Sequence, residues 1–147
     1  MDNSAAVIDA NIAIYALIAT DQTKLALSLL EGFQEQRVSL YAPGLWVSEV
    51  ASGIHKYLHA KLIPPEIAEE AVSDIFELGV TLMNETPAIC KSASRWATRL
   101  NQMAVYDGYY LAVSEELNAP LWTADKRLVN NAKQIGVSWV YWLGDLE

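Results

Sequence analysis

Short apolar runs alternate along the chain with longer segments in which apolar residues recur at helical spacing, and this pattern predicts alternating strands and helices. The run Ala5–Asp9 is apolar up to its last residue, which is typical of a strand buried on both faces. From Leu45 to Ala60 the apolar residues follow the periodicity of one helix face. Further strands are expected at Val38–Ala42, Gly79–Leu82, Ala119–Thr123 and Ser138–Tyr141, and further helices at Ile12–Ile18, Gln22–Gln36, Pro64–Leu78, Thr86–Met103, Asp107–Leu117 and Asp125–Gly136.

Local signals support several of these helix starts. Asp21 is a candidate N-cap for the second helix, and Thr86 followed by Pro87 is typical of an N-cap and first turn. Strands separated by helices imply a parallel sheet covered on both faces. We therefore expect an α/β protein, an α/β/α sandwich with a central, mostly parallel, five-stranded sheet, in which residues 1–147 form a single domain.

Composition narrows the class of protein. Apolar residues make up 52% of the 147 residues, which excludes disorder. The most apolar stretch, Ala5–Ala19, is interrupted by Asp9 and Asn11, so we expect no membrane span, and the start Met1-Asp2-Asn3 lacks the basic segment of a secretory signal. The single cysteine, Cys90, cannot form an intramolecular disulfide. We expect it to be a small buried hydrophobe, and the protein to be cytoplasmic.

The net charge of −8 weighs at first against nucleic acid as a partner. The acids are unevenly distributed, however, because five of the 18 lie on the predicted helix Pro64–Leu78 or at its end, where no basic residue accompanies them. Four others belong to the candidate site described next, so the rest of the chain is close to neutral. Charge therefore permits RNA binding and does not indicate it. The acidic helix itself is interpreted as a solvated face.

Four acids are predicted to meet at one edge of the sheet. Asp9 ends the first strand, Asp125 follows the fourth, and Glu49 lies in the first turns of the helix after the second strand. The helix that starts at Asp107 runs about 16 Å away from the carboxyl edge of the sheet. The strand Ala119–Thr123 runs about 16 Å in the opposite direction and returns the chain to the same edge. All four carboxylates should therefore lie at the carboxyl edge, where open parallel sheets carry their functional crevice.

Such a group of carboxylates needs a cation, because like charges in one place repel strongly. Oxygen ligands without cysteine favour Mg²⁺ or Mn²⁺ over zinc. A metal held in this way lowers the pKa of bound water and orients a phosphate, as phosphodiester hydrolysis requires. Each acid also has a plainer interpretation, since Asp107 and Asp125 could simply cap helices and Glu49 could face solvent. Asp9 is the strongest case, because a charge in an apolar passage is costly without a partner.

One resemblance to a known family rests on Val7–Ile12, on Leu45–Val50, and on Tyr106–Ala112 with Ala119–Leu128. In this order they resemble the opening motif, the glutamate-bearing helix and the C-terminal half of the PIN-domain family. The resemblance spans the chain in the expected order. Its one departure is Gly108, where alanine is more usual, and we expect it to loosen the helix start slightly.

The resemblance implies a metal-dependent endoribonuclease, and at this length a VapC-like toxin of a toxin–antitoxin pair. It implies that the four acids are catalytic and bind Mg²⁺ or Mn²⁺ directly or through water, and that Asn11 and Thr123 orient carboxylates or water. A metal-activated water would cleave RNA and leave 5′-phosphate and 3′-hydroxyl ends. It further implies a cognate antitoxin and a homodimer. Lys126 and Arg127 are the candidates for RNA contact.

Other functions remain open at the level of sequence. The alternatives are a housekeeping PIN nuclease and a catalytically inactive PIN-fold interaction protein. A haloacid-dehalogenase-type phosphatase would need a second aspartate where the chain has Asn11, and a nucleotide-binding module would need a glycine-rich loop after the first strand. His55 and His59 have the spacing of a zinc pair but lack the glutamate of a metalloprotease. The five tryptophans could stack on bases, although we expect core packing or a subunit interface.

Overall fold

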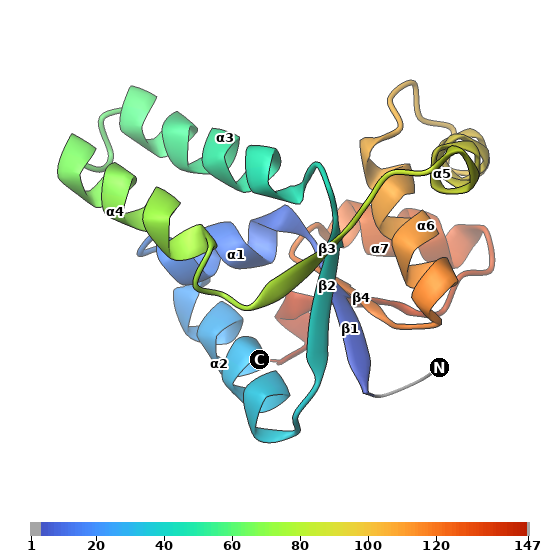
Figure 1. Cartoon of the computed structure of the whole chain (residues 1–147), viewed down its shortest axis with the longest axis horizontal. Coiled ribbons are helices and arrows are strands. Elements are labelled where there is room, and N and C mark those ends of the chain that lie inside the picture. Colours follow the sequence, from blue (N-terminus) through green and yellow to red (C-terminus); the bar gives the residue numbers. More distant parts are fainter. Residues whose placement is uncertain (1–3, 147) are drawn as a thin grey trace.

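Five parallel strands form the centre of the molecule, in the order β3-β2-β1-β4-β5. The structure is a computed structural model that describes residues 4–146. Figure 1 shows α1 to α4 on one side of the sheet and α5 to α7 on the other. The predicted α/β/α sandwich is therefore confirmed, and within the described residues every strand pairing is parallel.

The elements follow one another as the hydrophobic pattern predicts. The strands are β1 (Ala5–Ile8), β2 (Ser39–Pro43), β3 (Val80–Met83), β4 (Leu121–Thr123) and β5 (Val140–Trp142). The helices are α1 (Ala10–Leu17), α2 (Thr23–Glu35), α3 (Trp46–His59), α4 (Pro65–Ile75), α5 (Pro87–Arg99), α6 (Tyr106–Leu117) and α7 (Lys126–Gln134), followed by the short 3₁₀ helix η1 (Leu143–Leu146).

The order of the strands in the sheet reverses direction between β1 and β4. The chain moves from β1 outward to β2 and β3, and then crosses to β4 on the other side of β1, so the two halves of the sheet diverge at this pair. Val7 pairs with Leu121 and Ile8 with Trp122, which brings the next residues, Asp9 and Thr123, level with each other. In open parallel sheets such a point, at the carboxyl ends of the strands, is where ligands bind.

The core lies between the sheet and its helices and is built from aliphatic residues, two tryptophans and Tyr110. Val7, Ile8 and Leu121 are fully buried, as expected for central strands covered on both faces. Trp46 and Trp96 are also buried, which confirms core packing for these two, whereas the other three tryptophans are only half-buried. No helix among residues 4–146 combines the length and the hydropathy that crossing a membrane requires.

The start of α2 differs from the prediction. Asp21 does not cap it, and the helix begins at Thr23. The Thr23 hydroxyl instead accepts a hydrogen bond from the Thr20 amide at 2.8 Å and donates one to the Ile18 carbonyl at 2.9 Å. Threonine hydroxyls therefore satisfy the backbone groups of this turn, and the Asp21 side chain is left exposed.

Two helix ends were also predicted too late. Helix α4 ends at Ile75 rather than Leu78, because Gly79 adopts a left-handed turn (φ 72°) that leads into β3. Helix α5 ends at Arg99 rather than Met103, because Asn101 is left-handed (φ 55°) and the Gln102 amide bonds back to a carbonyl of the last turn, a C-terminal capping motif that terminates helices.

Cys90 is exposed, so its interpretation as a buried hydrophobe was wrong. It lies on the outer face of α5, whose inner face is formed by Ile89, Ala93 and Trp96. The Tyr109 hydroxyl donates a hydrogen bond to its Sγ atom at 3.2 Å.

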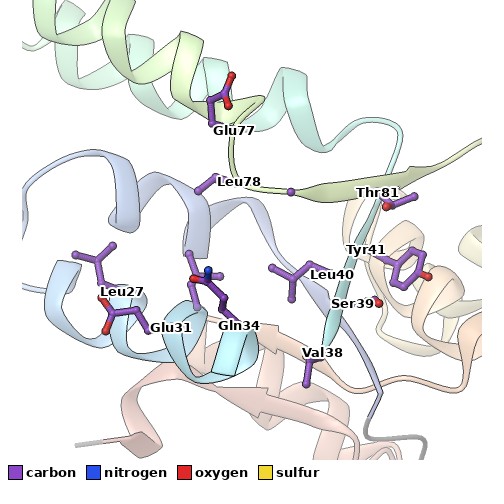
Figure 2. Close-up of a pocket in the computed structure, with 12 residues that line it drawn as sticks. Leu27, Glu31, Gln34, Val38, Ser39, Leu40, Tyr41, Glu77, Leu78 and Thr81 are labelled. Atoms are coloured by element: carbon purple, nitrogen blue, oxygen red, sulfur yellow. The ribbon is translucent and has the colours of Figure 1, made fainter. Parts of the chain in front are cut away.

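A groove of about 570 Å³ lies at the opposite end of the strands, where β2 and β3 begin. Figure 2 shows Leu27, Glu31 and Gln34 on α2 and Leu40 on β2, whose side chain points toward that helix. None of the four predicted site acids lines this groove.

Candidate metal centre

Asp9 is fixed at the junction of β1 and α1. Its amide donates to the Trp122 carbonyl at 2.9 Å, which extends the β1–β4 pairing by one residue. Its side chain caps α1, because Oδ1 accepts a hydrogen bond from the Ala10 amide at 2.7 Å. Oδ2 accepts a second bond from the Thr123 hydroxyl at 2.8 Å. The carboxylate is only 8% exposed, so its orientation is set by the fold.

Thr123 and Asn11 connect the ends of the two central strands. The Asn11 amide nitrogen donates to the Thr123 hydroxyl at 3.2 Å and lies 3.4 Å from Asp9 Oδ2. Asn11 Oδ1 accepts a bond from the Ala124 amide, and the Thr123 hydroxyl accepts one from the Asp125 amide, both at 3.0 Å. Two aspartates and two strand ends therefore share one hydrogen-bond network, which lies where the sequence predicted residues that orient carboxylates.

Glu49 enters the site from the first turn of α3 and is held by Tyr110 of α6. The tyrosine hydroxyl donates to Glu49 Oε1 at 2.6 Å, a short bond of the charge-assisted type. Tyr110 is 1% exposed, and burial, with the nearby carboxylates, raises its hydroxyl pKa. The hydroxyl therefore stays protonated and acts as a permanent donor to Glu49.

Asp107 lies in the first turn of α6 and is held by Gln102, whose Nε2 donates to Oδ2 at 2.8 Å. Gln102 is placed there by the tight end of α5. Gly108, next to Asp107, packs so close to α5 that an added Cβ would lie 2.2 Å from the Ala93 carbonyl oxygen. The glycine therefore permits the close approach of the two helices.

Asp125 is the N-cap of α7. Its Oδ1 accepts bonds from the Arg127 amide at 3.0 Å and the Leu128 amide at 3.3 Å. The plainer interpretation of this residue as a cap is therefore correct as far as it goes. Both bonds end on Oδ1, so Oδ2 takes no part in the cap and can face a ligand.

Electrostatics link the four acids. Burial raises the pKa of Asp9 from 3.8 to about 7, with repulsion from Asp107 and Glu49 adding to it, and the Thr123 and Ala10 hydrogen bonds acting against it. Burial also raises the pKa of Glu49, with Asp107 adding to it, and that of Asp107, with Asp125 adding to it. These four side chains therefore form one group of mutually repelling carboxyls.

The donor set suits a hydrated divalent cation. Among residues 4–146, no three His, Cys, Asp or Glu side chains lie close enough together to hold one ion as they stand. The four carboxyls are therefore near enough to repel one another, although they are not close enough to ligate one ion together. Mg²⁺ keeps several waters and takes only one or two carboxylates directly, so closer packing is not required. Oxygen donors whose charge is penalised by burial and repulsion fit a hard cation of this kind.

The structure separates the two basic residues predicted to contact RNA. Arg127 lines a cleft beside Asp107 and Asp125, whereas the Lys126 ammonium lies 4.6 Å from the centre of the Trp142 ring and does not line that cleft. His55 and His59 are exposed on α3, as expected, with ring centres 6.3 Å apart.

Two residues at the site were missed in the sequence. Tyr110 could have been found, because it lies one helical turn after Asp107 and therefore on the same face of α6. Gln102 carried no such signal. Its position depends on where α5 ends, and the sequence pattern extended that helix too far.

Comparison with known proteins places this arrangement in a family. The family model described as PIN domain matches residues 7–138. The chain is similar to Ribonuclease VapC9 of Mycobacterium tuberculosis and to VapC ribonuclease Mb0985 of Mycobacterium bovis, each 30% identical over 122 residues that cover 83% of this chain and 87% of the relative.

Solved structures agree on the fold. A toxin–antitoxin complex from Klebsiella pneumoniae contains a chain that matches with a TM-score of 0.64 at 18% identity, covering 94% of this chain and 97% of the other. VapBC2 from Rickettsia felis bound to a promoter DNA fragment matches with a TM-score of 0.66 at 15% identity, covering 93% and 97%. The family match over most of the chain and the parallel sheet with acids at its carboxyl edge lead to one conclusion: this chain belongs to the PIN-domain family.

Proposed function

We propose that this chain is a Mg²⁺- or Mn²⁺-dependent endoribonuclease and the toxin of a type II toxin–antitoxin pair. The observation that carries the proposal is the group of mutually repelling carboxyls at the carboxyl ends of β1 and β4, of which Asp9 is buried and the other three are half-buried. Perturbed carboxyls gathered in a crevice are typical of a functional site. Relatives that are 30% identical over most of the chain are named ribonucleases, which supports RNA as the substrate.

The residues that would hold the cation are Asp9, Glu49, Asp107 and Asp125. When bound, a divalent cation supplies an activated water and neutralises charge on the phosphate under attack. The chain itself supplies orientation. Thr123 and Asn11 fix the Asp9 carboxylate, and Tyr110 fixes that of Glu49. Because these partners are buried or tied to the backbone, the carboxylates are organised before RNA arrives.

The first experiment tests the chemistry. Purified Asp9→Asn should show no Mg²⁺- or Mn²⁺-dependent cleavage of labelled RNA while the wild type cleaves it. The amide keeps a side-chain oxygen for the cap of α1, so circular dichroism should report an intact fold. Cleavage by the variant at the wild-type rate would overturn the proposal.

The second experiment tests the biological role. Solved neighbours of the same fold are described as toxin–antitoxin complexes, which supports a neutralising protein partner and action in the cytoplasm, and the family supports a homodimer. Induction of the chain in a bacterial host should arrest growth, and co-expression of a small adjacent reading frame should relieve the arrest. Absence of arrest from an active enzyme would instead indicate a housekeeping nuclease.

A further inference from the structure

A polar cleft of about 310 Å³ opens beside the acidic site, between the end of α5 and the first turns of α7. Its polar walls are formed by Asn101, Gln102, Asp107, Asp125, Arg127 and Asn131. Two of these residues belong to the proposed metal centre, so whatever occupies the cleft lies next to the reacting atoms. We infer that this cleft binds a phosphodiester group of the RNA strand adjacent to the scissile bond, with Arg127 as its cation and Asn131 as a neutral donor. The inference rests on the proposed function.

Arg127 is the only cation among the described residues that line the cleft. Within residues 4–146 its amide is bonded to Asp125, while its guanidinium is exposed and makes no hydrogen bond. The arginine lines the same cleft as Asp107 and Asp125, so its charge lies beside the site. An exposed arginine beside two carboxylates that await a metal is well placed to pair with a phosphate, which it can bind with two parallel N–H bonds.

Two other cations of the same region are already engaged. Lys126 lies over the Trp142 ring at 4.6 Å, and Arg99 lies over the Trp96 ring at 4.5 Å and also donates to the Ile135 carbonyl. Arg127 therefore differs from its neighbours in having its charge directed at the cleft. This contrast assigns the predicted RNA contact to Arg127 and not to Lys126.

Asn131 follows Arg127 by one turn of α7 and so faces the same way. It is half-buried, and its side-chain amide makes no hydrogen bond within residues 4–146. A neutral amide donates to a phosphate without adding charge. Opposite, the left-handed Asn101 forms the turn that places Gln102 against Asp107, so the two walls of the cleft are set by a capped helix end and by α7.

This arrangement also explains how an acidic protein can bind RNA. Each phosphate contact made by a cation contributes to affinity through released counterions, and a chain with net charge −8 cannot rely on many such contacts. One directed arginine, neutral amides and a bound metal ion would suffice for a short strand. The volume of the cleft lies at the lower end for ligand sites, which suits one nucleotide unit rather than a duplex.

The test measures RNA binding apart from cleavage. In full-length Asp9→Asn with MnCl₂, anisotropy of a short fluorescein-labelled single-stranded RNA of mixed sequence gives the affinity at several salt concentrations. Adding Arg127→Ala should weaken binding about tenfold. It should also reduce the slope of log affinity against log salt by about 0.7, as expected for one lost contact to single-stranded RNA. Arg127→Lys should keep the slope and recover part of the affinity.

Matched variants separate this result from general damage. Lys126→Ala removes the same charge one residue away and should leave both affinity and slope unchanged. Asn131→Ala should weaken binding about threefold without changing the slope. Arg127→Ala should not weaken Mn²⁺ binding measured by calorimetry in the otherwise wild-type chain, because it removes a positive charge from beside the metal.

Unchanged RNA affinity in Arg127→Ala, or equal losses in Arg127→Ala and Lys126→Ala, would overturn the inference. This result is independent of the proposed function, because that proposal is tested by comparing RNA cleavage by the wild type and by Asp9→Asn. If the wild-type chain bound RNA through Arg127 but did not cleave it, the proposed ribonuclease activity would be wrong and the inferred RNA-binding cleft would still hold.

Discussion

The groove at β2 and β3 and the cleft at the metal centre differ in a way that volume alone does not reveal. The groove at the amino ends of β2 and β3 is the larger, at about 570 Å³, and the cleft at the metal centre measures about 310 Å³. In the groove, Glu31 and Glu77 are exposed, and their side-chain carboxylates make no hydrogen bond within residues 4–146. At the metal centre, Asp9 and Glu49 accept bonds from residues far away in the chain.

The difference follows from the topology. At the carboxyl ends of β1 and β4 the chain leaves in opposite directions, and the first turns of several helices bring polar side chains to one point. At the amino ends of β2 and β3 the chain arrives from helix ends, and the residues there are not drawn together. A functional site is therefore better identified by convergent buried polar groups than by the size of a hollow.

The largest expected difference between the two sites comes from replacing a glutamate by glutamine in each. Glu49→Gln should lower Mn²⁺-dependent RNA cleavage by more than about 100-fold, the upper range for residues that merely orient a ligand. Glu31→Gln in the groove should stay within about twofold of the wild type, as an exposed substitution does. Initial rates on labelled RNA give both values, and similar losses in the two variants would erase the distinction.

The next effect is on stability in the absence of metal. The raised pKa of Asp9 means that the folded protein holds a proton that the unfolded chain releases above about pH 4. This stabilisation is complete below the unfolded pKa and is lost as pH rises through about 7. Asp9 alone should therefore lower the unfolding free energy of the metal-free protein by about 4 kcal/mol between pH 4 and pH 8.

Urea unfolding across that pH range measures this loss. Asp9→Asn should make the profile shallower, because this side chain no longer titrates while Glu49 and Asp107, whose pKa values are also raised, still do. Glu31→Gln should follow the wild type. Adding MnCl₂ at pH 8 should raise the unfolding free energy of the wild-type protein again. If the unfolding free energy of the metal-free wild type rose with pH over this range, the pKa of Asp9 would not be raised in the folded protein.

A smaller effect is expected from the hydrogen-bond network. Thr123→Val keeps the shape of a strand residue but removes the hydroxyl bonded to Asp9, Asn11 and the Asp125 amide, and cleavage should fall about 10- to 100-fold. Thr81→Val in β3, where the side chain is exposed beside the groove, should leave cleavage unchanged. An equal fall in the two variants would mean that the network at Asp9 has no special role.

Much of this site follows from sequence because its positions are set by the ends of elements. Asp9 and Asp125 follow strands, and Glu49 and Asp107 start helices, so a parallel sheet brings them to one edge. The apolar pattern is sufficient to predict that topology.

The partners of these acids were harder to foresee. Tyr110 meets Glu49 across 61 positions of sequence, through the packing of α6 against the sheet. The engagement of Lys126 with Trp142, and of Arg127 with the cleft, depends on side-chain directions that neighbouring elements decide. Periodicity also says little about which residue ends a helix, and so the end of α5 and the place of Gln102 were not predicted.

The most direct test of the central claim is a crystal structure of the protein grown with MnCl₂, with the ion located by its anomalous scattering. The account predicts manganese in the space between Asp9, Glu49, Asp107 and Asp125, bound by their oxygens directly or through water. Carboxylates that point apart with no manganese between them, in protein that cleaves RNA under the same conditions, would contradict it.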